Sequence, residues 1–255
     1  MRRSLIGAVA AATALVCAGV AAGITNGEPD GSGHPYVGAL LAQQAFSDGT
    51  WEECTGTLIA PRVFLTAEHC DEGVSRVAVT FDSDYVASTG TTYWGTWHGD
   101  PAYKKSNGDP HDIAVVVLDK APKGLTPARL PGLNQLTSLQ GGDPIVSVGY
   151  GAQSVTSDHG GKTLHYQDTR FVATGSFTTL TQAYLKASMN PTHGDGGTCY
   201  GDSGGPNFLG AGSTETDIVA GTTITGDFMC RATNVDYRMD TESARSFLGQ
   251  FVTLP

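Results

Sequence analysis

Near its C-terminal end the sequence reads Cys199-Tyr200-Gly201-Asp202-Ser203-Gly204-Gly205-Pro206, and this stretch decides the fold class. In a chain of this composition, a chance Gly-Asp-Ser-Gly-Gly-Pro has odds on the order of 10⁻⁴. Gly201 lets the backbone turn so that the N–H groups of Gly201 and Ser203 point into one small cavity. A developing oxyanion requires such a cavity. We therefore predict that Ser203 is a nucleophile beside an oxyanion hole made by the Gly201 and Ser203 amides.

A second segment with chemical potential, Leu65-Thr66-Ala67-Glu68-His69-Cys70, lies far upstream. A His between a strand end and a cysteine that can form a disulfide has a fixed backbone, which a general base needs. Alone, His69 is weak evidence, because a solitary His is more often structural. The six other histidines take that structural interpretation: His34, His98, His111, His159, His165 and His193.

The third segment begins with Asp112 and continues as the apolar run 113–118. A carboxylate at the mouth of a buried strand is costly unless it accepts hydrogen bonds, and a His N–H is a suitable donor. For Asp112 alone, the more common role is that of a turn residue that starts a strand. Its predicted role beside His69 therefore depends on the other two segments.

The composition indicates a packed all-β protein. The 255 residues carry a net charge of −10 with only 16% charged residues, which disfavours nucleic acid as a main partner. The 34 Gly and 12 Pro show no Gly-X-Y period, and they separate short runs rich in β-branched residues. One helix is predicted over about 241–252, where Ala244, Phe247, Leu248 and Phe251 share a face.

Residues 1–23 have the pattern of a secretory signal peptide: Arg2 and Arg3 precede an uncharged run that ends in small residues. The run is about long enough to be read as a membrane anchor, but it is weakly hydrophobic and rich in Ala and Gly. Cleavage after Ala22 or after Gly23 fits the small-residue rule, and the second cut makes Ile24 the mature N-terminus. The prediction is a secreted, extracellular protein without a stable membrane anchor.

Removal of that segment takes Cys17 away and leaves four cysteines. They could pair in three ways, of which Cys54–Cys70 and Cys199–Cys230 join sequence neighbours and are the simplest framework for an exported chain. A zinc site is disfavoured, because no Cys or His pair has ligand spacing. No metal or organic cofactor is predicted.

Together these segments resemble the trypsin/chymotrypsin-type serine peptidases, peptidase family S1, and particularly their secreted bacterial members. The resemblance covers nearly all of the chain after residue 23, in the family's order and with its intervals. The matching segments are Ile24-Thr25-Asn26-Gly27, Cys54-Thr55-Gly56-Thr57-Leu58-Ile59, Leu65 to Cys70, Asp112 to Leu118, Val148-Gly149-Tyr150-Gly151 and Gly201 to Pro206.

The resemblance implies an all-β fold of two packed six-stranded antiparallel β-barrels (chymotrypsin-like) with a C-terminal α-helix. The barrels would span about 24–130 and 131–240, with the active site between them. It also implies an endopeptidase in which His69, Asp112 and Ser203 act as general base, orienting acid and nucleophile through an acyl-enzyme. In this family the new N-terminal amine pairs with the Asp beside the nucleophile, which here gives Ile24 and Asp202.

The substrate pocket implied by the family contains Gly197, Thr198, Thr225 and Gly226. With Gly197 at its base and no acid there, we expect an uncharged, apolar or small P1 side chain. Asp195, Asp227 and Asp236 could supply charge from elsewhere.

Three departures from the family pattern stand out. Glu68 occupies a usually small position, where it could face solvent or alter the surroundings of His69. Ile224 stands where a Ser usually supports the Asp, and Thr225 stands where an aromatic residue is usual. Either this alignment slips by a residue or the support of Asp112 differs.

Two other functions remain to be weighed. A catalytically silent homologue that acts as a binding module is disfavoured, because all three triad residues are present. An α/β-hydrolase is disfavoured, because its Gly-x-Ser-x-Gly elbow joins a strand to a helix. The partners expected are protein or peptide substrates and protein inhibitors, and the protein is expected to be a monomer.

Overall fold

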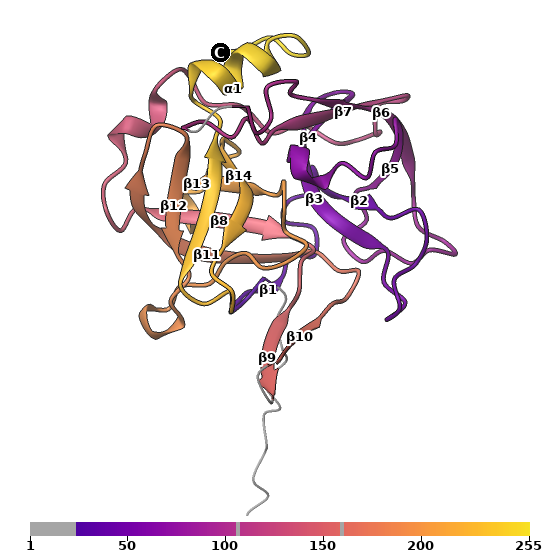
Figure 1. The fold of residues 1–255 in the computed structure, drawn as a ribbon, viewed down its shortest axis with the longest axis horizontal. Helices are drawn as coiled ribbons and strands as arrows, with labels where there is room; N and C mark the ends of the chain where they lie inside the picture. The colour runs from indigo at the N-terminus through magenta and orange to yellow at the C-terminus, as the bar shows by residue number, and fades with distance from the viewer. Residues whose placement is uncertain (1–23, 106–107, 159–160) are drawn as a thin grey trace, which may run out of the picture.

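The computed structural model describes residues 24–105, 108–158 and 161–255, so the predicted signal peptide lies outside the described residues. Two bodies of antiparallel strands lie side by side, with the N-terminal half of the chain in one and the C-terminal half in the other (Figure 1). This confirms the prediction of two six-stranded barrels with a helix at the end of the chain. No helix among the described residues is long and apolar enough to cross a bilayer.

The first barrel is closed in the order β2-β3-β4-β7-β6-β5. Its bounds are β2 Val37–Leu41, β3 Glu52–Ala60, β4 Val63–Thr66, β5 Arg76–Thr80, β6 Tyr93–Gly99 and β7 Ala114–Leu118. Apolar side chains from facing strands, such as Leu58, Phe64 and Val116, fill its interior and are fully buried. The β-branched run of β7 suits a strand that is buried over nearly all its length.

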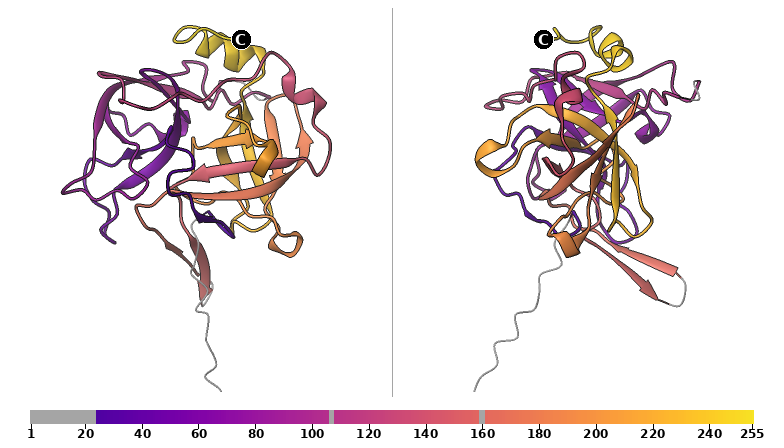
Figure 2. Two further views of the ribbon diagram at one scale, coloured as in Figure 1. Left: turned by 180° about the vertical axis from the view of Figure 1, so that it is seen from behind. Right: turned by 90° about the vertical axis from the view of Figure 1, so that its left-hand side faces the viewer.

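The second barrel is closed by the pairing of β8 with both β11 and β13, in the order β11-β12-β15-β14-β13-β8. Its bounds are β8 Pro144–Gly149, β11 Phe171–Leu180, β12 Tyr184–Ser188, β13 Pro206–Leu209, β14 Val219–Gly226 and β15 Thr233–Arg238. The hairpin of β9 Ser154–Asp158 and β10 Gly161–His165 projects away from the barrels (Figure 2). Within the described residues, four short 3₁₀ helices lie between strands: Glu68–Cys70, Gln135–Ser138, Pro191–His193 and Gly212–Thr214.

The first strand and the last helix of the described residues each contact the other half of the molecule. Strand β1, Glu28–Pro29, pairs with β11 of the second barrel, although its sequence position placed it in the first half. Helix α1, Glu242–Leu248, follows the second barrel and contacts the first: Ser243 donates a hydrogen bond to Asp109 at 2.5 Å, and the Phe251 ring lies 5.3 Å from that of His98. The helix is shorter than the predicted 241–252: it ends at Leu248, and the chain continues from the Gly249 cap as turns.

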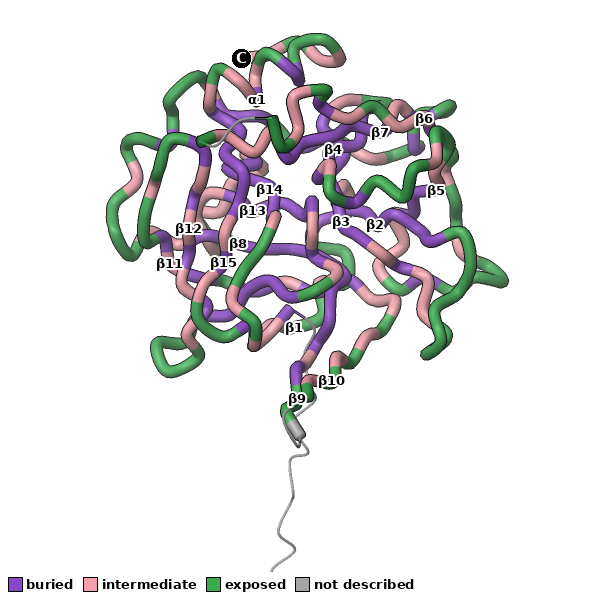
Figure 3. The backbone as a smooth tube through the Cα atoms, viewed as in Figure 1, coloured by how far each residue is buried: buried purple, intermediate pink, exposed green. Residues whose placement is uncertain are grey.

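Hydrogen bonds between strands and the loops next to them join the two barrels, and Figure 3 shows buried backbone in purple on both sides. The Arg170 guanidinium donates to the Val37 carbonyl at 2.9 Å, and the Tyr150 hydroxyl donates to the Asp82 carbonyl at 2.9 Å. The Thr55 N–H of β3 donates to the Ser203 carbonyl at 2.8 Å. The loop that carries Ser203 is therefore held directly against the first barrel.

Candidate active site

His69 and Asp112 meet because they extend from neighbouring strands. His69 follows the end of β4 and Asp112 precedes β7, and these strands pair with Thr66 opposite Ala114. The His69 ring Nδ1 lies 2.8 Å from Asp112 Oδ2, and the His69 backbone N–H donates to Asp112 Oδ1 at 2.9 Å. Both carboxylate oxygens thus accept from the same residue, which fixes the ring and leaves Nε2 directed away from Asp112.

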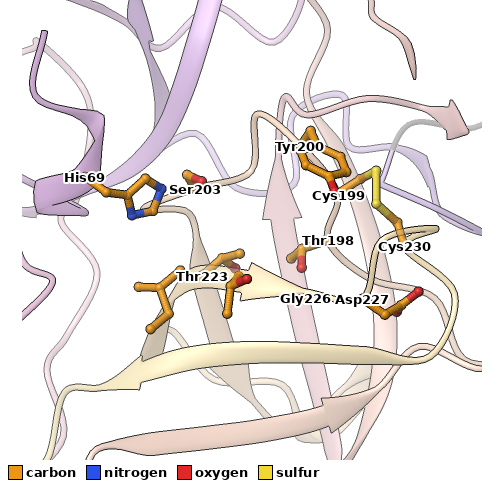
Figure 4. Close-up of a pocket in the computed structure, with 11 residues that line it drawn as sticks. His69, Thr198, Cys199, Tyr200, Ser203, Thr223, Gly226, Asp227 and Cys230 are labelled. Carbon is orange, nitrogen blue, oxygen red and sulfur yellow. A yellow bond between two sulfur atoms is a disulfide. The ribbon is translucent and has the colours of Figure 1, made fainter. Parts of the chain in front are cut away.

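Ser203 comes from the second barrel, in the loop before β13. It lines the same cavity as His69, and Figure 4 shows its side chain beside the His69 ring. In the described structure no hydrogen bond joins Ser203 Oγ to that ring. Such contacts are often long without substrate and shorten in the reacting complex. His69 and Ser203 thus line one cavity, while Asp112 does not line it and contacts the Nδ1 side of the His69 ring.

The loop before Ser203 has the sharp turns that were expected of its glycines. Gly201 has a φ of +96°, and a Cβ there would lie 2.9 Å from the Gly151 Cα. The N–H groups of Asp202, Gly204 and Gly205 donate to backbone carbonyls. Among the described backbone contacts, the N–H groups of Gly201 and Ser203 donate to none. Both remain available to a substrate oxygen, as an oxyanion hole requires.

The carboxylate of Asp202 is fully buried beneath this loop. It accepts hydrogen bonds from the Gly151 and Cys199 N–H groups, each at 2.8 Å. Burial raises the pKa of Asp202 to about 7, although these bonds favour its ionised form. Ile24 is also fully buried, against Phe171 and Ala173. The predicted Ile24–Asp202 ion pair needs a chain that begins at Ile24, so it stays a prediction.

A cavity of about 330 Å³ opens beside His69 and Ser203. Thr198, Thr225 and Gly226 line it as predicted, while Gly197 does not, because the buried Met189 side chain lies against it. The Cys199–Cys230 disulfide borders the cavity, and Cys54–Cys70 joins β3 to the segment of His69, so both predicted pairings are confirmed. The complete lining is His69, Thr198, Cys199, Tyr200, Ser203, Thr223, Ile224, Thr225, Gly226, Asp227 and Cys230.

A family model described as Trypsin matches residues 24–246. The chain belongs to the trypsin family. This family consists of serine peptidases of the S1 type, and the match covers the whole region in which the sequence resembled it.

Individual relatives of this trypsin-family chain are distant. It is 28% identical over 216 residues to a chymotrypsin of Phaedon cochleariae, covering 78% of this chain and 71% of that protein. It is 26% identical over 167 residues to trypsin delta and trypsin gamma of Drosophila melanogaster, covering 62% of this chain and 64% of each trypsin. The matched region thus spans somewhat less than two thirds of the two fly proteins.

Solved structures agree on the fold. Human heparin binding protein superposes with a TM-score of 0.66 at 18% identity, over 90% of this chain and 96% of that one. An atomic-resolution structure of HBP gives a TM-score of 0.67 at 18% identity, over 91% and 98% of the two chains. At such low identity the likeness establishes the fold alone.

This trypsin-family chain differs from the usual pattern at Ile224. The Ile224 side chain packs against the apolar cores of both barrels and carries no donor. Among the described residues, both hydrogen bonds to the Asp112 carboxylate come from His69. The His69–Asp112 contact is therefore supported by packing and by the His69 backbone, without a neighbouring hydroxyl.

The rim of the cavity contains a cluster that sequence reasoning missed. The Lys162 ammonium of β10 lies 3.3 Å from the Tyr200 ring centroid and 4.3 Å from that of Phe228. This cation–π contact ties the projecting hairpin to the edge of the substrate pocket. The place of Tyr200 within the serine motif could have drawn attention to it, whereas no sequence pattern marks Lys162 or Phe228.

Glu68, the unusual neighbour of His69, is half-buried and faces β6. The Trp97 indole N–H donates to its carboxylate at 3.2 Å, and a Cβ on Gly99 would collide with the carboxylate. Burial raises the pKa of Glu68 to about 7 against the effect of the Trp97 bond, and the negative charges of Asp71, Asp112 and Asp100 raise it further. The carboxylate therefore faces protein groups as well as solvent.

This environment gives a testable dependence of stability on pH. The folded-state pKa of Glu68 lies above 4.5, the ordinary value of a glutamate, so folding favours the neutral acid. That contribution to stability is complete below pH 4.5 and is lost as pH rises toward 7. Glu68→Gln stays neutral and keeps an acceptor for Trp97. The melting temperature of Glu68→Gln minus that of the native protein should increase as pH rises from 4.5 to 7. Above pH 7 this difference should stay constant.

The matched control is Glu28→Gln, at an exposed position in β1. Differential scanning calorimetry of the three proteins at pH 4.5, 6, 7 and 8 measures the effect. A difference between Glu68→Gln and the native protein that is flat across this range would contradict the buried, charge-crowded setting of Glu68.

The described residues contain no group of three or more His, Cys, Asp or Glu side chains placed to hold a metal ion.

Proposed function

We propose that this chain is a secreted serine endopeptidase that hydrolyses peptide bonds through His69, Asp112 and Ser203. The observation that carries the proposal is that His69 contacts the Asp112 carboxylate twice, through its ring Nδ1 at 2.8 Å and its backbone N–H at 2.9 Å, and lines one cavity with Ser203. Membership of the trypsin family supports the same reaction class.

In the proposed mechanism, His69 Nε2 removes the Ser203 proton as Oγ attacks the substrate carbonyl carbon. The N–H groups of Gly201 and Ser203 stabilise the oxyanion that forms. Asp112 holds the imidazole tautomer and stabilises its cation. His69 then protonates the leaving amine, and a water molecule hydrolyses the acyl-enzyme by the same sequence of proton transfers.

The direct test is covalent labelling with a fluorophosphonate, followed by peptide mapping, together with hydrolysis of casein by the chain that begins at Ile24. We expect a single label on Ser203 and measurable proteolysis. A chain that folds but neither reacts with the probe nor cleaves casein would refute the proposal and favour a binding module. No structural observation favours that alternative. Human heparin binding protein is named for a polyanion, whereas the net charge here is −10.

We further propose that a free amine at Ile24 completes the site by pairing with Asp202. Three features support this. Ile24 is buried, and Thr25 pairs with Gly197 beside the substrate pocket. The Asp202 carboxyl group is also buried, and burial raises its pKa to about 7. An ammonium nearby would lower the pKa of Asp202 and hold the oxyanion loop in place.

Adding one residue at the N-terminus should therefore lower activity strongly. Breaking a buried ion pair costs about 3–5 kcal/mol, so a chain that begins at Gly23 should be less active than one that begins at Ile24 by about 100-fold or more. Peptide hydrolysis and titration of accessible active sites compare the two chains, and Edman sequencing of exported protein identifies the natural cut. Equal activity of the two chains would refute the pairing.

A further inference from the structure

Thr198 carries a hydroxyl in the wall of the cavity beside Ser203, and the Met189 thioether lies behind that hydroxyl. Thr198 lines it and is almost fully buried, and Figure 4 draws it among the lining side chains. Met189 is also buried and fills the space next to Gly197, where an added Cβ would lie 2.6 Å from Met189 Cγ and 2.7 Å from Sδ. The Thr198 hydroxyl is therefore a buried polar group of the cavity wall, with the apolar Met189 side chain behind it.

A chain of buried side chains behind the cavity fixes where the Thr198 proton points. Thr198 Oγ1 lies 2.6 Å from Asn234 Oδ1, and the Asn234 amide donates to Asn207 Oδ1 at 2.9 Å. The Asn207 amide donates in turn to Asp236 Oδ1 at 2.7 Å. Ser147 also donates to Asn207 Oδ1, at 2.6 Å.

The direction of this chain is set at its far end by Asp236. Asp236 Oδ1 also accepts from Thr223, so it is an acceptor whether or not the acid is ionised. Burial raises the pKa of Asp236 to about 8, against the hydrogen bonds that it accepts, and because Oδ1 already accepts from Thr223 a bound proton would sit on Oδ2. The NH₂ group of Asn207 must therefore face Asp236, and its carbonyl must face Asn234.

The same donor and acceptor argument applies to Asn234 and Thr198, which lie nearer the cavity. The NH₂ group of Asn234 faces Asn207, so the Asn234 carbonyl faces Thr198 and takes the single hydroxyl proton. The Thr198 contact with Met189 Sδ, at 3.9 Å, is too long to compete. Thr198 is left with oxygen lone pairs alone for a substrate, so this part of the cavity wall accepts hydrogen bonds and does not donate them from this hydroxyl.

We propose that the cavity selects a P1 residue whose neutral side chain ends in a hydrogen-bond donor, for which glutamine is the test case. This inference rests on the proposed endopeptidase function and specifies its substrate class. A glutamate side chain of the same shape has only acceptors when ionised and would meet the Thr198 lone pairs. A methionine side chain fits the apolar walls but leaves the hydroxyl oxygen without its partner.

A cationic side chain is not matched by this part of the cavity wall. A cation would be desolvated beside the neutral Thr198 oxygen, and no described carboxylate is bonded to that hydroxyl. Asp227 does line the cavity, but its carboxylate accepts backbone N–H groups from Met229, Arg231, Ala232 and Thr233, and Figure 4 shows its side chain directed away from Thr198. Asp195 accepts a hydrogen bond from Ser176 and does not line the cavity.

The test uses chromogenic peptides that differ only at P1, with Gln, Met, Glu or Arg, and three proteins: native, Thr198→Val and Thr198→Ser. Recognition through a buried hydroxyl should give the native enzyme a kcat/KM about tenfold higher for Gln than for Met. Thr198→Val should bring the two substrates to within about twofold, chiefly through Gln, whereas Thr198→Ser should keep the preference. Fluorophosphonate labelling rates show whether each variant retains its active site.

The outcomes separate this inference from the proposed function. Native protein that does not react with fluorophosphonate overturns the proposed function. Native protein that reacts and hydrolyses peptides, but prefers Met, Glu or Arg to Gln, overturns the selectivity alone. An unchanged Gln preference in Thr198→Val, with normal labelling, overturns the role of the hydroxyl. If Thr198→Val fails to fold because Asn234 loses its donor, loss of the preference in Thr198→Ser would overturn the same role.

Discussion

Ser203→Ala is expected to lower peptide hydrolysis by about 10⁶-fold, the scale on which removal of a serine nucleophile acts in serine peptidases. The Thr55 N–H binds the Ser203 carbonyl, and the Gly201 and Ser203 amides belong to the backbone, so alanine leaves the loop and the oxyanion hole in place. The loss should therefore appear in kcat, with substrate binding retained.

Initial rates on a P1 series and fluorophosphonate labelling measure this change. The matched control is Ser246→Ala, an exposed serine of α1 away from the cavity, which should keep native activity and stability. Retained proteolysis by Ser203→Ala in protein free of contaminating peptidase would defeat the assignment of the nucleophile.

Asp112→Asn should lower kcat by about 10⁴-fold near neutral pH, as loss of the correct imidazole tautomer does in this mechanism. The geometry explains why the substitution is severe. The His69 backbone N–H already donates to Oδ1, so the asparagine carbonyl must stay there and its NH₂ group must face Nδ1. Nδ1 then has to accept, which places the ring proton on Nε2, where the base for Ser203 is needed.

The control for this prediction is Asp71→Asn, which removes an exposed carboxylate close to His69 without touching its ring. It should keep most of the activity, because exposed charges are screened by water and salt. Comparable losses in Asp71→Asn and Asp112→Asn would show that general negative charge, rather than the tautomer, is what the ring needs.

The positions of the residues proposed for catalysis could be inferred from the sequence because short segments contain them. The serine motif carries its own turn geometry, and His69 and Asp112 each stand at the end of a strand whose pattern is visible in the sequence. The two disulfides join cysteines that are neighbours in the chain. These features depend on local residue order, so they could be read before the barrels were known.

The polar chain behind the substrate cavity could not be predicted in this way. It depends on Thr223 lying opposite Asp236, and the register of these two strands shifts between Thr223 and Thr225. A slip of one residue would turn Asp236 away from Asn207 and toward the other face of the sheet. Met189 and Gly197 likewise meet only through tertiary packing, which explains why Gly197 was expected in the lining and is covered instead.

The crossed attachment of the two chain ends has a mechanical consequence. Strand β1, the first described strand, pairs with the C-terminal barrel. Helix α1 is hydrogen-bonded to the N-terminal half, so each half contacts an element of the other. Cleavage of the connection between β7 and β8 would leave two fragments that remain joined through β1 and α1. Separation of the fragments would require the contacts of both β1 and α1 to break. Thermal motion alone is therefore poorly able to separate His69 from Ser203.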